Sequence, residues 1–135
     1  MYNIGYDIGS SSIKAALVEV DTGKQIAVTQ EPEGEMGMIS PKASWAEQDP
    51  EVWWELICLA TKKLLKQTGI DPAKISGIGI AYQMHGLVVV DRNGSPLRNA
   101  IIWCDSRAVA IGNEAFKALG TKKCMEHLLN SPARS

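Results

Sequence analysis

A short run of small residues joins two apolar segments near the start of the sequence, and it limits the fold more than any other feature. Residues 3–8 and 13–20 have the composition of two strands, and the connection holds Gly9 and three serines, Ser10, Ser11 and Ser12. A turn with so little side-chain bulk lets a ligand approach the backbone closely. Its N–H groups and hydroxyls can converge on phosphate oxygens, with Lys14 as a nearby positive charge.

Asp7 lies near the end of the first of these segments and needs a different role. A carboxylate repels phosphate, so Asp7 would act through magnesium or the water molecules that magnesium binds. The alternative is a serine-rich hairpin turn with a solvated Asp7. The residues alone slightly favour this alternative, because the stretch matches neither the Walker phosphate loop nor the dinucleotide-binding fingerprint.

Length and composition predict one small domain, residues 1–135, with small-molecule partners. The chain has 135 residues, of which 45% are hydrophobic, and its net charge is -1. This balance gives no basic surface for nucleic acid or an anionic membrane. Three separated cysteines favour buried thiols in a reducing compartment over disulfides or zinc. No apolar run reaches the length of a membrane span, so we expect a cytoplasmic protein.

The rest of the pattern predicts an α/β domain with a mixed sheet. A hairpin turn at 21–24 precedes a strand at 25–29, and 31–44 is a long loop. Asp49 and Pro50 begin a helix that runs to about 67 and ends at Gly69. Further strands are expected at 75–81, 87–90 and 100–103, and further helices at 109–119 and 121–129.

Two polar groups follow the later strands. Gln83 offers a hydrogen-bond donor and an acceptor, and His85 is a titratable group beside a flexible glycine, which together suit a polyhydroxylated ligand. An equally good reading makes Met84 core filler and His85 a partly buried, satisfied side chain. Farther on, Asp105 or Ser106 can cap the next helix, or Asp105 can pair with Arg107 or a sugar hydroxyl.

With these residues in view, the chain resembles the FGGY carbohydrate kinases, and within them the xylulokinases. Four stretches carry the resemblance: Gly5-Tyr6-Asp7-Ile8-Gly9-Ser10-Ser11-Ser12-Ile13-Lys14, Trp45-Ala46-Glu47-Gln48-Asp49-Pro50, Gln83-Met84-His85-Gly86 and Ala100-Ile101-Ile102-Trp103-Cys104-Asp105-Ser106-Arg107. The third is the most specific, because other sugar kinases of the family differ there. Cys104 departs from the family's commoner Asn.

The resemblance implies a ribonuclease-H-like mixed sheet with flanking helices, as in the actin, sugar kinase and chaperone ATPase superfamily. It implies ATP-dependent phosphorylation of D-xylulose to D-xylulose 5-phosphate, with ATP and Mg²⁺ as cofactors. Its residue assignments are Asp7 for magnesium and phosphoryl positioning, Gly9, Ser10, Ser11, Ser12 and Lys14 for the phosphate turn, and Gln83, Met84, His85, Asp105 and Arg107 for the sugar.

Such a kinase also needs a carboxylate that accepts the proton of the substrate hydroxyl. In the family this aspartate, the adenosine pocket and the second domain lie beyond position 135, so we expect an N-terminal fragment, the incomplete first lobe, without turnover by itself. The rival readings are a non-catalytic sugar-binding or assembly module, another FGGY pentulose kinase, and an actin-like or chaperone-like ATPase lobe. Uncovered apolar surface would also favour a homo-oligomer.

Overall fold

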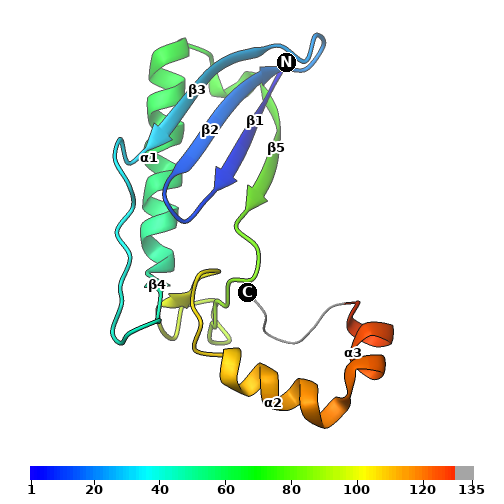
Figure 1. Ribbon diagram of the computed structural model, residues 1–135. Coiled ribbons are helices and arrows are strands. Elements are labelled where there is room, and N and C mark those ends of the chain that lie inside the picture. Colours follow the sequence, from blue (N-terminus) through cyan, green and yellow to red (C-terminus); the bar gives the residue numbers. More distant parts are fainter. Residues whose placement is uncertain (130–135) are drawn as a thin grey trace.

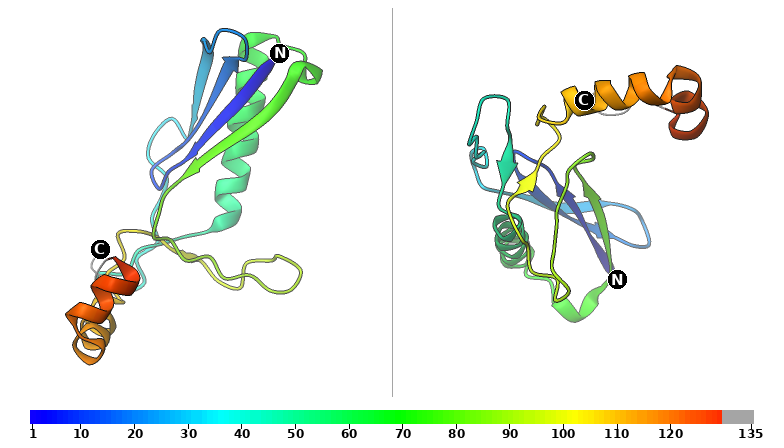
Figure 2. Two further views of the ribbon diagram at one scale, coloured as in Figure 1. Left: turned by 90° about the vertical axis from the view of Figure 1, so that its right-hand side faces the viewer. Right: turned by 90° about the horizontal axis from the view of Figure 1, so that it is seen from below.

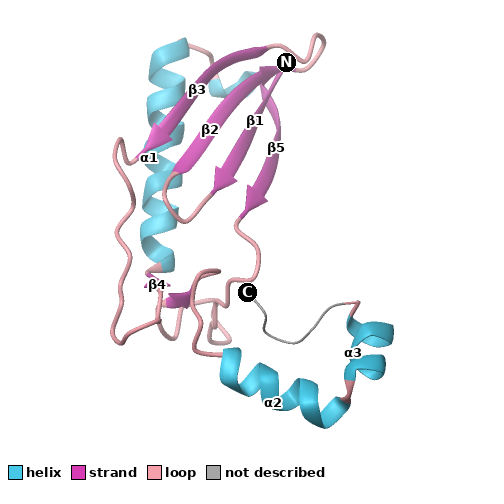
Figure 3. Ribbon diagram, viewed as in Figure 1, coloured by secondary structure: helices cyan, strands magenta, loops and turns pink. Residues whose placement is uncertain are grey.

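A computed structural model describes residues 1–129 of the chain, which form a four-stranded sheet, one long helix, a small second sheet and two C-terminal helices (Figures 1 and 3). The elements in chain order are β1 (Tyr2–Ile8), β2 (Ile13–Glu19), β3 (Gln25–Glu31), β4 (Glu47–Gln48), α1 (Pro50–Thr68), the 3-10 helix η1 (Pro72–Lys74), β5 (Ile75–Tyr82), β6 (Ala100–Ile101), α2 (Val109–Leu119) and α3 (Thr121–Leu128).

The main sheet is mixed, with the strand order β3-β2-β1-β5. Strands β1, β2 and β3 form two successive antiparallel pairs, whereas β5 lies parallel to β1 after the crossover through α1. Parallel neighbours need such a long connection, because their like ends lie at the same edge of the sheet. The register pairs Ile8 with Ile13 and with Tyr82, so the ends of all three strands meet at the turn 9–12.

The hydrophobic core lies between the sheet and α1, which crosses one face over β2 and β3 (Figure 1). Its buried members come from alternate strand positions and from one side of the helix: Ile4, Tyr6, Ala15, Leu17, Ala60 and Leu64. The alternation places these strand residues on a single face of the sheet. Polar groups in the layer are paired, since the hydroxyls of Tyr6 and Thr61 lie 2.6 Å apart and Thr29 Oγ1 donates to the Ala60 carbonyl at 2.9 Å.

The ends of α1 confirm the sequence prediction. Asp49 Oδ1 accepts a hydrogen bond from the Glu51 backbone N–H at 3.0 Å, and Pro50 occupies the first turn. At the other end Gly69 has φ 64°, and its N–H donates to the Leu65 carbonyl. The left-handed backbone conformation costs glycine little free energy, which explains why the helix ends at this position.

Strand β5 is one of the two edge strands of the sheet, and its side chains are largely uncovered. Ile78 and Ile80 are 66% and 63% exposed. They line an apolar groove between β5 and α1, which Trp54 borders from the helix. Trp54 itself is 62% exposed.

The segments after β5 are less regular than predicted. The expected strand 87–90 is reduced to isolated bridges, Leu87 with Ile101 and Val90 with Pro96, and the expected strand 100–103 is regular only over β6. Figure 2 shows that the connection between β5 and β6 projects beyond the sheet, with α2 and α3 lying past the sheet's end. Within residues 1–129, no helix combines the length and the apolar character needed to cross a membrane.

One expectation, about the cysteines, was wrong, and one of the alternatives for Asp105 and Ser106 is excluded. Of the three cysteines only Cys124 is buried; Cys58 is half-buried and Cys104 is exposed. Helix α2 has no side-chain cap: Ala108 occupies the capping position, because Asp105 is bonded elsewhere. The bounds of α2 agree with the prediction, and α3 ends one residue earlier.

Candidate functional site

The structure brings three of the sequence motifs into direct contact. The Gln83 backbone N–H donates to the Ile8 carbonyl at 3.0 Å, which continues the β1–β5 ladder past the strand ends. The Trp103 indole N–H donates to Ser10 Oγ at 3.0 Å. A pair of backbone hydrogen bonds between Leu87 and Ile101 then joins the segment that follows Gln83 to the segment that contains Trp103. The serine turn, the segment 83–87 and the segment 101–103 therefore form one connected region.

The carbonyl oxygens of all three serines in the turn accept hydrogen bonds from the protein. Ser10 O accepts from Gln48 Nε2 at 2.7 Å, and Ser11 O accepts from the Met36 backbone N–H at 2.7 Å. Ser12 O accepts from the Gly9 backbone N–H at 3.1 Å, which closes the turn. Carbonyl oxygens that already accept hydrogen bonds repel an anion less than unbonded ones do. The serine hydroxyls can still donate hydrogen bonds. This arrangement suits a phosphate-binding turn.

Asp7 and Lys14 face each other across the β1–β2 ladder. The distance from Asp7 Oδ2 to Lys14 Nζ is 4.0 Å, and the side chains are 59% and 51% exposed, so both are accessible to a ligand. Within the described residues 1–129, no group of three or more His, Cys, Asp or Glu side chains is placed to hold a metal ion. A single accessible carboxylate suits a magnesium ion that keeps most of its water ligands, and this role of Asp7 stays a prediction.

Gln83 carries the least satisfied polar group of the region. Its amide Oε1 and Nε2 are buried and have no hydrogen-bond partner among the described residues. Buried amides are normally paired, because an unpaired one loses its hydrogen bonds to water without replacement. An amide that is both donor and acceptor fits a ligand hydroxyl, which needs both.

The next two residues are exposed. Met84 is accessible, and His85 adopts a left-handed conformation with φ 62°. This conformation is uncommon for a residue other than glycine and often occurs where function requires it. The structure therefore excludes the reading in which Met84 fills the core and His85 is partly buried.

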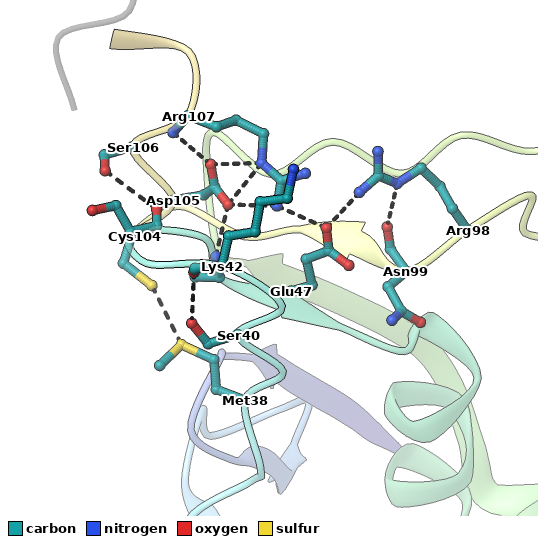
Figure 4. A network of polar contacts seen from close by, with 12 residues as sticks. Met38, Ser40, Lys42, Glu47, Arg98, Asn99, Cys104, Asp105, Ser106 and Arg107 are labelled. Atoms are coloured by element: carbon teal, nitrogen blue, oxygen red, sulfur yellow. Dashed lines mark hydrogen bonds and ion pairs between the residues drawn. The ribbon is translucent and has the colours of Figure 1, made fainter.

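Asp105 and Arg107 lie in a network of charged groups near the start of α2 (Figure 4). Asp105 Oδ2 accepts from the Ala46 backbone N–H and from Arg107 Nη2, each at 2.7 Å. Arg107 Nη2 also donates to Glu47 Oε1 at 2.7 Å, and Arg98 Nη2 pairs with the same carboxylate. The Arg107 guanidinium lies 3.7 Å from the centre of the Trp45 ring.

This network lowers the pKa of both carboxylates. Hydrogen bonds from the Arg107 side chain lower the pKa of Asp105 to about 2, with a further contribution from the Ala46 N–H and some opposition from desolvation. The pKa of Glu47 is also lowered, chiefly by its hydrogen bond with Arg107. The pKa of Arg107 rises, chiefly because of its hydrogen bond to Asp105. The network is therefore fully charged at neutral pH.

The predicted pairing of Asp105 with Arg107 is confirmed. Their side chains hold the segments 45–47 and 105–107 together, and only 1% of the Asp105 side chain is exposed. A direct contact of Asp105 and Arg107 with sugar stays a prediction.

The sequence reasoning missed two residues that hold the serine turn, Gln48 and Trp103. Both lie in stretches that were singled out, but neither was given a role. The available signal was their residue type, because amide and indole N–H groups normally find hydrogen-bond partners in a folded protein.

Comparison with known proteins gives the family. Residues 2–131 match the model of the N-terminal domain of the FGGY family of carbohydrate kinases. The chain belongs to this family. FGGY carbohydrate kinases similar to it include the xylulose kinase of Bacillus subtilis (strain 168), which is 39% identical over 129 residues. The alignment covers 96% of this chain and 24% of that enzyme.

Two further comparisons bear on substrate and fold. The L-xylulose/3-keto-L-gulonate kinase of Escherichia coli (strain K12) is 36% identical over 110 residues, which cover 82% of this chain and 21% of that enzyme. The crystal structure of xylulose kinase from Rhodospirillum rubrum superposes with a TM-score of 0.82 at 26% identity, over 93% of this chain and 25% of that one. The mixed sheet is therefore that of the sugar kinases, as the resemblance implied. This chain spans about a quarter of these relatives.

Proposed function

We propose that this FGGY kinase chain forms the part of a xylulose kinase where the sugar meets the transferable phosphate of ATP. The reaction is phosphorylation of D-xylulose to D-xylulose 5-phosphate. The observation that carries the proposal is the unpaired, buried amide of Gln83, which lies directly after β5 and whose backbone bonds to the end of β1. This observation supports a site for hydroxyl groups beside a turn suited to phosphate.

We assign the roles that the resemblance implies, and the geometry of the site supports them. Gln83, Met84 and His85 contact the sugar, with Asp105 and Arg107 retained as candidates that hold the neighbouring loop. The turn 9–12 and Lys14 bind phosphate oxygens. Asp7 orients the magnesium that accompanies ATP, and this metal neutralises phosphate charge when it is bound. A cytoplasmic location is part of the proposal, because ATP is available there.

The isolated 135-residue chain should not turn over. Phosphoryl transfer to a sugar needs a carboxylate that accepts the hydroxyl proton. Of the two carboxylates predicted for the site, Asp105 is bonded to Arg107 and Ala46, and Asp7 serves the metal. The expected contribution of this chain alone is weak binding, since a pocket normally encloses most of its ligand.

The test combines calorimetry with a coupled ATP assay on the purified chain. We expect D-xylulose to bind with a millimolar dissociation constant, Gln83→Leu to abolish binding, and no turnover with MgATP. Turnover near the ordinary kinase range of about 1 to 100 per second would contradict the inactive part of the proposal. Absence of any D-xylulose binding would contradict the sugar site.

One specific observation favours a second candidate substrate. The Escherichia coli relative is named for L-xylulose and 3-keto-L-gulonate, and it is nearly as similar to this chain as the Bacillus subtilis enzyme. Parallel titrations with D-xylulose and L-xylulose decide between the two sugars. Tighter binding of L-xylulose would replace the substrate while keeping the rest of the proposal.

A further inference from the structure

Ser10 is held from two sides by side chains that are distant in sequence. The Trp103 indole N–H donates to its hydroxyl oxygen at 3.0 Å, and Gln48 Nε2 donates to its backbone carbonyl at 2.7 Å. Gln48 is almost fully buried, whereas Trp103 is about half exposed. The turn therefore depends on two segments that come together only in the folded chain.

The orientation of the Gln48 amide follows from its partners. Its Oε1 accepts from the Trp53 indole N–H at 3.2 Å, and an indole N–H can only donate. Nε2 must then face the other way, where it donates to the carbonyls of Ser10 and, at 3.1 Å, Gly37. This one amide fixes the turn against α1 and against the loop before β4.

Trp103 determines the hydrogen-bonding sense of the Ser10 hydroxyl by the same logic. Because the indole can only donate, Ser10 Oγ accepts there, and the hydroxyl proton is left to point elsewhere. The Ser10 carbonyl is already engaged by Gln48. Ser10 thus presents a donor and no free carbonyl, as a phosphoryl oxygen requires.

We propose that Trp103 and Gln48 are positioning residues that make Ser10 a hydrogen-bond donor to the phosphate groups of a nucleotide. The inference rests on the proposed function and deepens it: neither side chain touches the phosphate, and both act through Ser10. Trp103 sets the direction of the hydroxyl proton, and Gln48 keeps the backbone carbonyl turned into the protein.

A double-mutant cycle on the purified chain tests the Trp103 part. Trp103→Phe keeps an aromatic ring but removes the indole N–H, and Ser10→Ala removes the hydroxyl. The probe is MgATP, titrated at millimolar concentration while amide NMR shifts of residues 9–12 are followed. We expect each single change to weaken binding about three- to tenfold, as for the loss of one hydrogen bond, and the double variant to bind no more weakly than Ser10→Ala.

The matched control is Trp54→Phe, an exposed indole on α1 that should leave MgATP affinity unchanged. Unchanged affinity in Trp103→Phe, or a loss that persists in the Ser10→Ala background, overturns the Trp103 role while the proposed function stands. No saturable shift in the unchanged chain overturns both.

A ligand-free measurement separates positioning from packing. The Trp103 indole N–H resonance should shift in Ser10→Ala, whereas that of Trp53 should not. For Gln48, Gln48→Glu keeps the size of the side chain but replaces the donor to Ser10 O. We expect it to weaken MgATP binding at least threefold with the fold retained, and unchanged binding would remove Gln48 from the proposal.

Discussion

The backbone N–H of Gln83 donates to the carbonyl of Ile8 at 3.0 Å, so the β1–β5 pairing extends to the first residue of the stretch 83–86. This bond fixes the Gln83 backbone, while its amide stays buried and has no hydrogen-bond partner within residues 1–129. The position of the side chain is therefore set by the sheet, and the amide costs free energy when no ligand is bound.

Gln83→Leu should consequently separate stability from binding. Removing an unpaired buried amide should raise the free energy of unfolding by about 1 kcal/mol, while D-xylulose binding is lost. Urea unfolding and calorimetry measure the two effects. Gln67→Leu, at an exposed position of α1, is the control and should change neither. A large destabilisation by Gln83→Leu would mean that the amide has a partner.

His85 allows a similar separation through its backbone. Its left-handed conformation costs a residue with a side chain about 1 kcal/mol, which glycine largely avoids. His85→Gly should therefore keep or slightly raise the unfolding midpoint in urea, whereas His85→Ala should not raise it. Both should weaken sugar binding. A lower midpoint for the glycine variant than for the alanine variant would argue against strain at this residue.

The Asp105–Arg107 network predicts sensitivity to acid. The folded pKa of Asp105 is about 2, below the ordinary value of 3.8, so the native state binds its proton less readily than the unfolded state. The stability it contributes is complete above pH 4 and is lost as the pH falls toward 2. Urea titrations between pH 6 and pH 2 measure this loss. Asp105→Asn should flatten the acid limb, and an unaltered limb would exclude Asp105 as its source.

Leu64 tests the core under α1. It is fully buried between the helix and the sheet, so Leu64→Ala should lower the free energy of unfolding by about 3 kcal/mol. Leu59→Ala is the matched control, because Leu59 lies on the same helix and is half exposed. Its cost should stay below about 1 kcal/mol. Equal losses in urea unfolding would show that the two sides of α1 are not distinct.

The open edge at β5 should promote self-association of the purified chain. An uncovered strand edge with exposed Ile78 and Ile80 attracts other apolar surfaces. Ile80→Lys should reduce the concentration dependence of the mass measured by light scattering. Ile111→Lys, at an exposed position of α2, should not. A monomeric profile of the unchanged chain at high concentration would contradict this expectation.

Local features were predictable from the sequence, and contacts between distant segments were not. The bounds of α1 followed from Asp49, Pro50 and Gly69, which act on neighbouring residues. The pairing of Asp105 with Arg107 was also foreseen, because two positions separate them. Their bonds to Glu47 and the ring of Trp45 were not, since these partners lie about sixty positions earlier.

The candidate site shows the same division. Resemblance to a family identified the motifs, but the residues that hold them in place carry no local signal. Gln48 bonds to a turn 38 positions away and Trp103 to one 93 positions away. Such partners depend on the sheet register, which a local pattern leaves undetermined.

The parallel pairing of β1 with β5 also has a kinetic consequence. Strands β1 to β3 are joined by short turns and can pair early, whereas β5 must find β1 across the whole of α1. The serine turn can therefore form with the hairpins, but Gln83 reaches Ile8 only after this late docking. We expect the segment that begins at Gln83, which is proposed to bind sugar, to reach its place at the end of the sheet last during refolding.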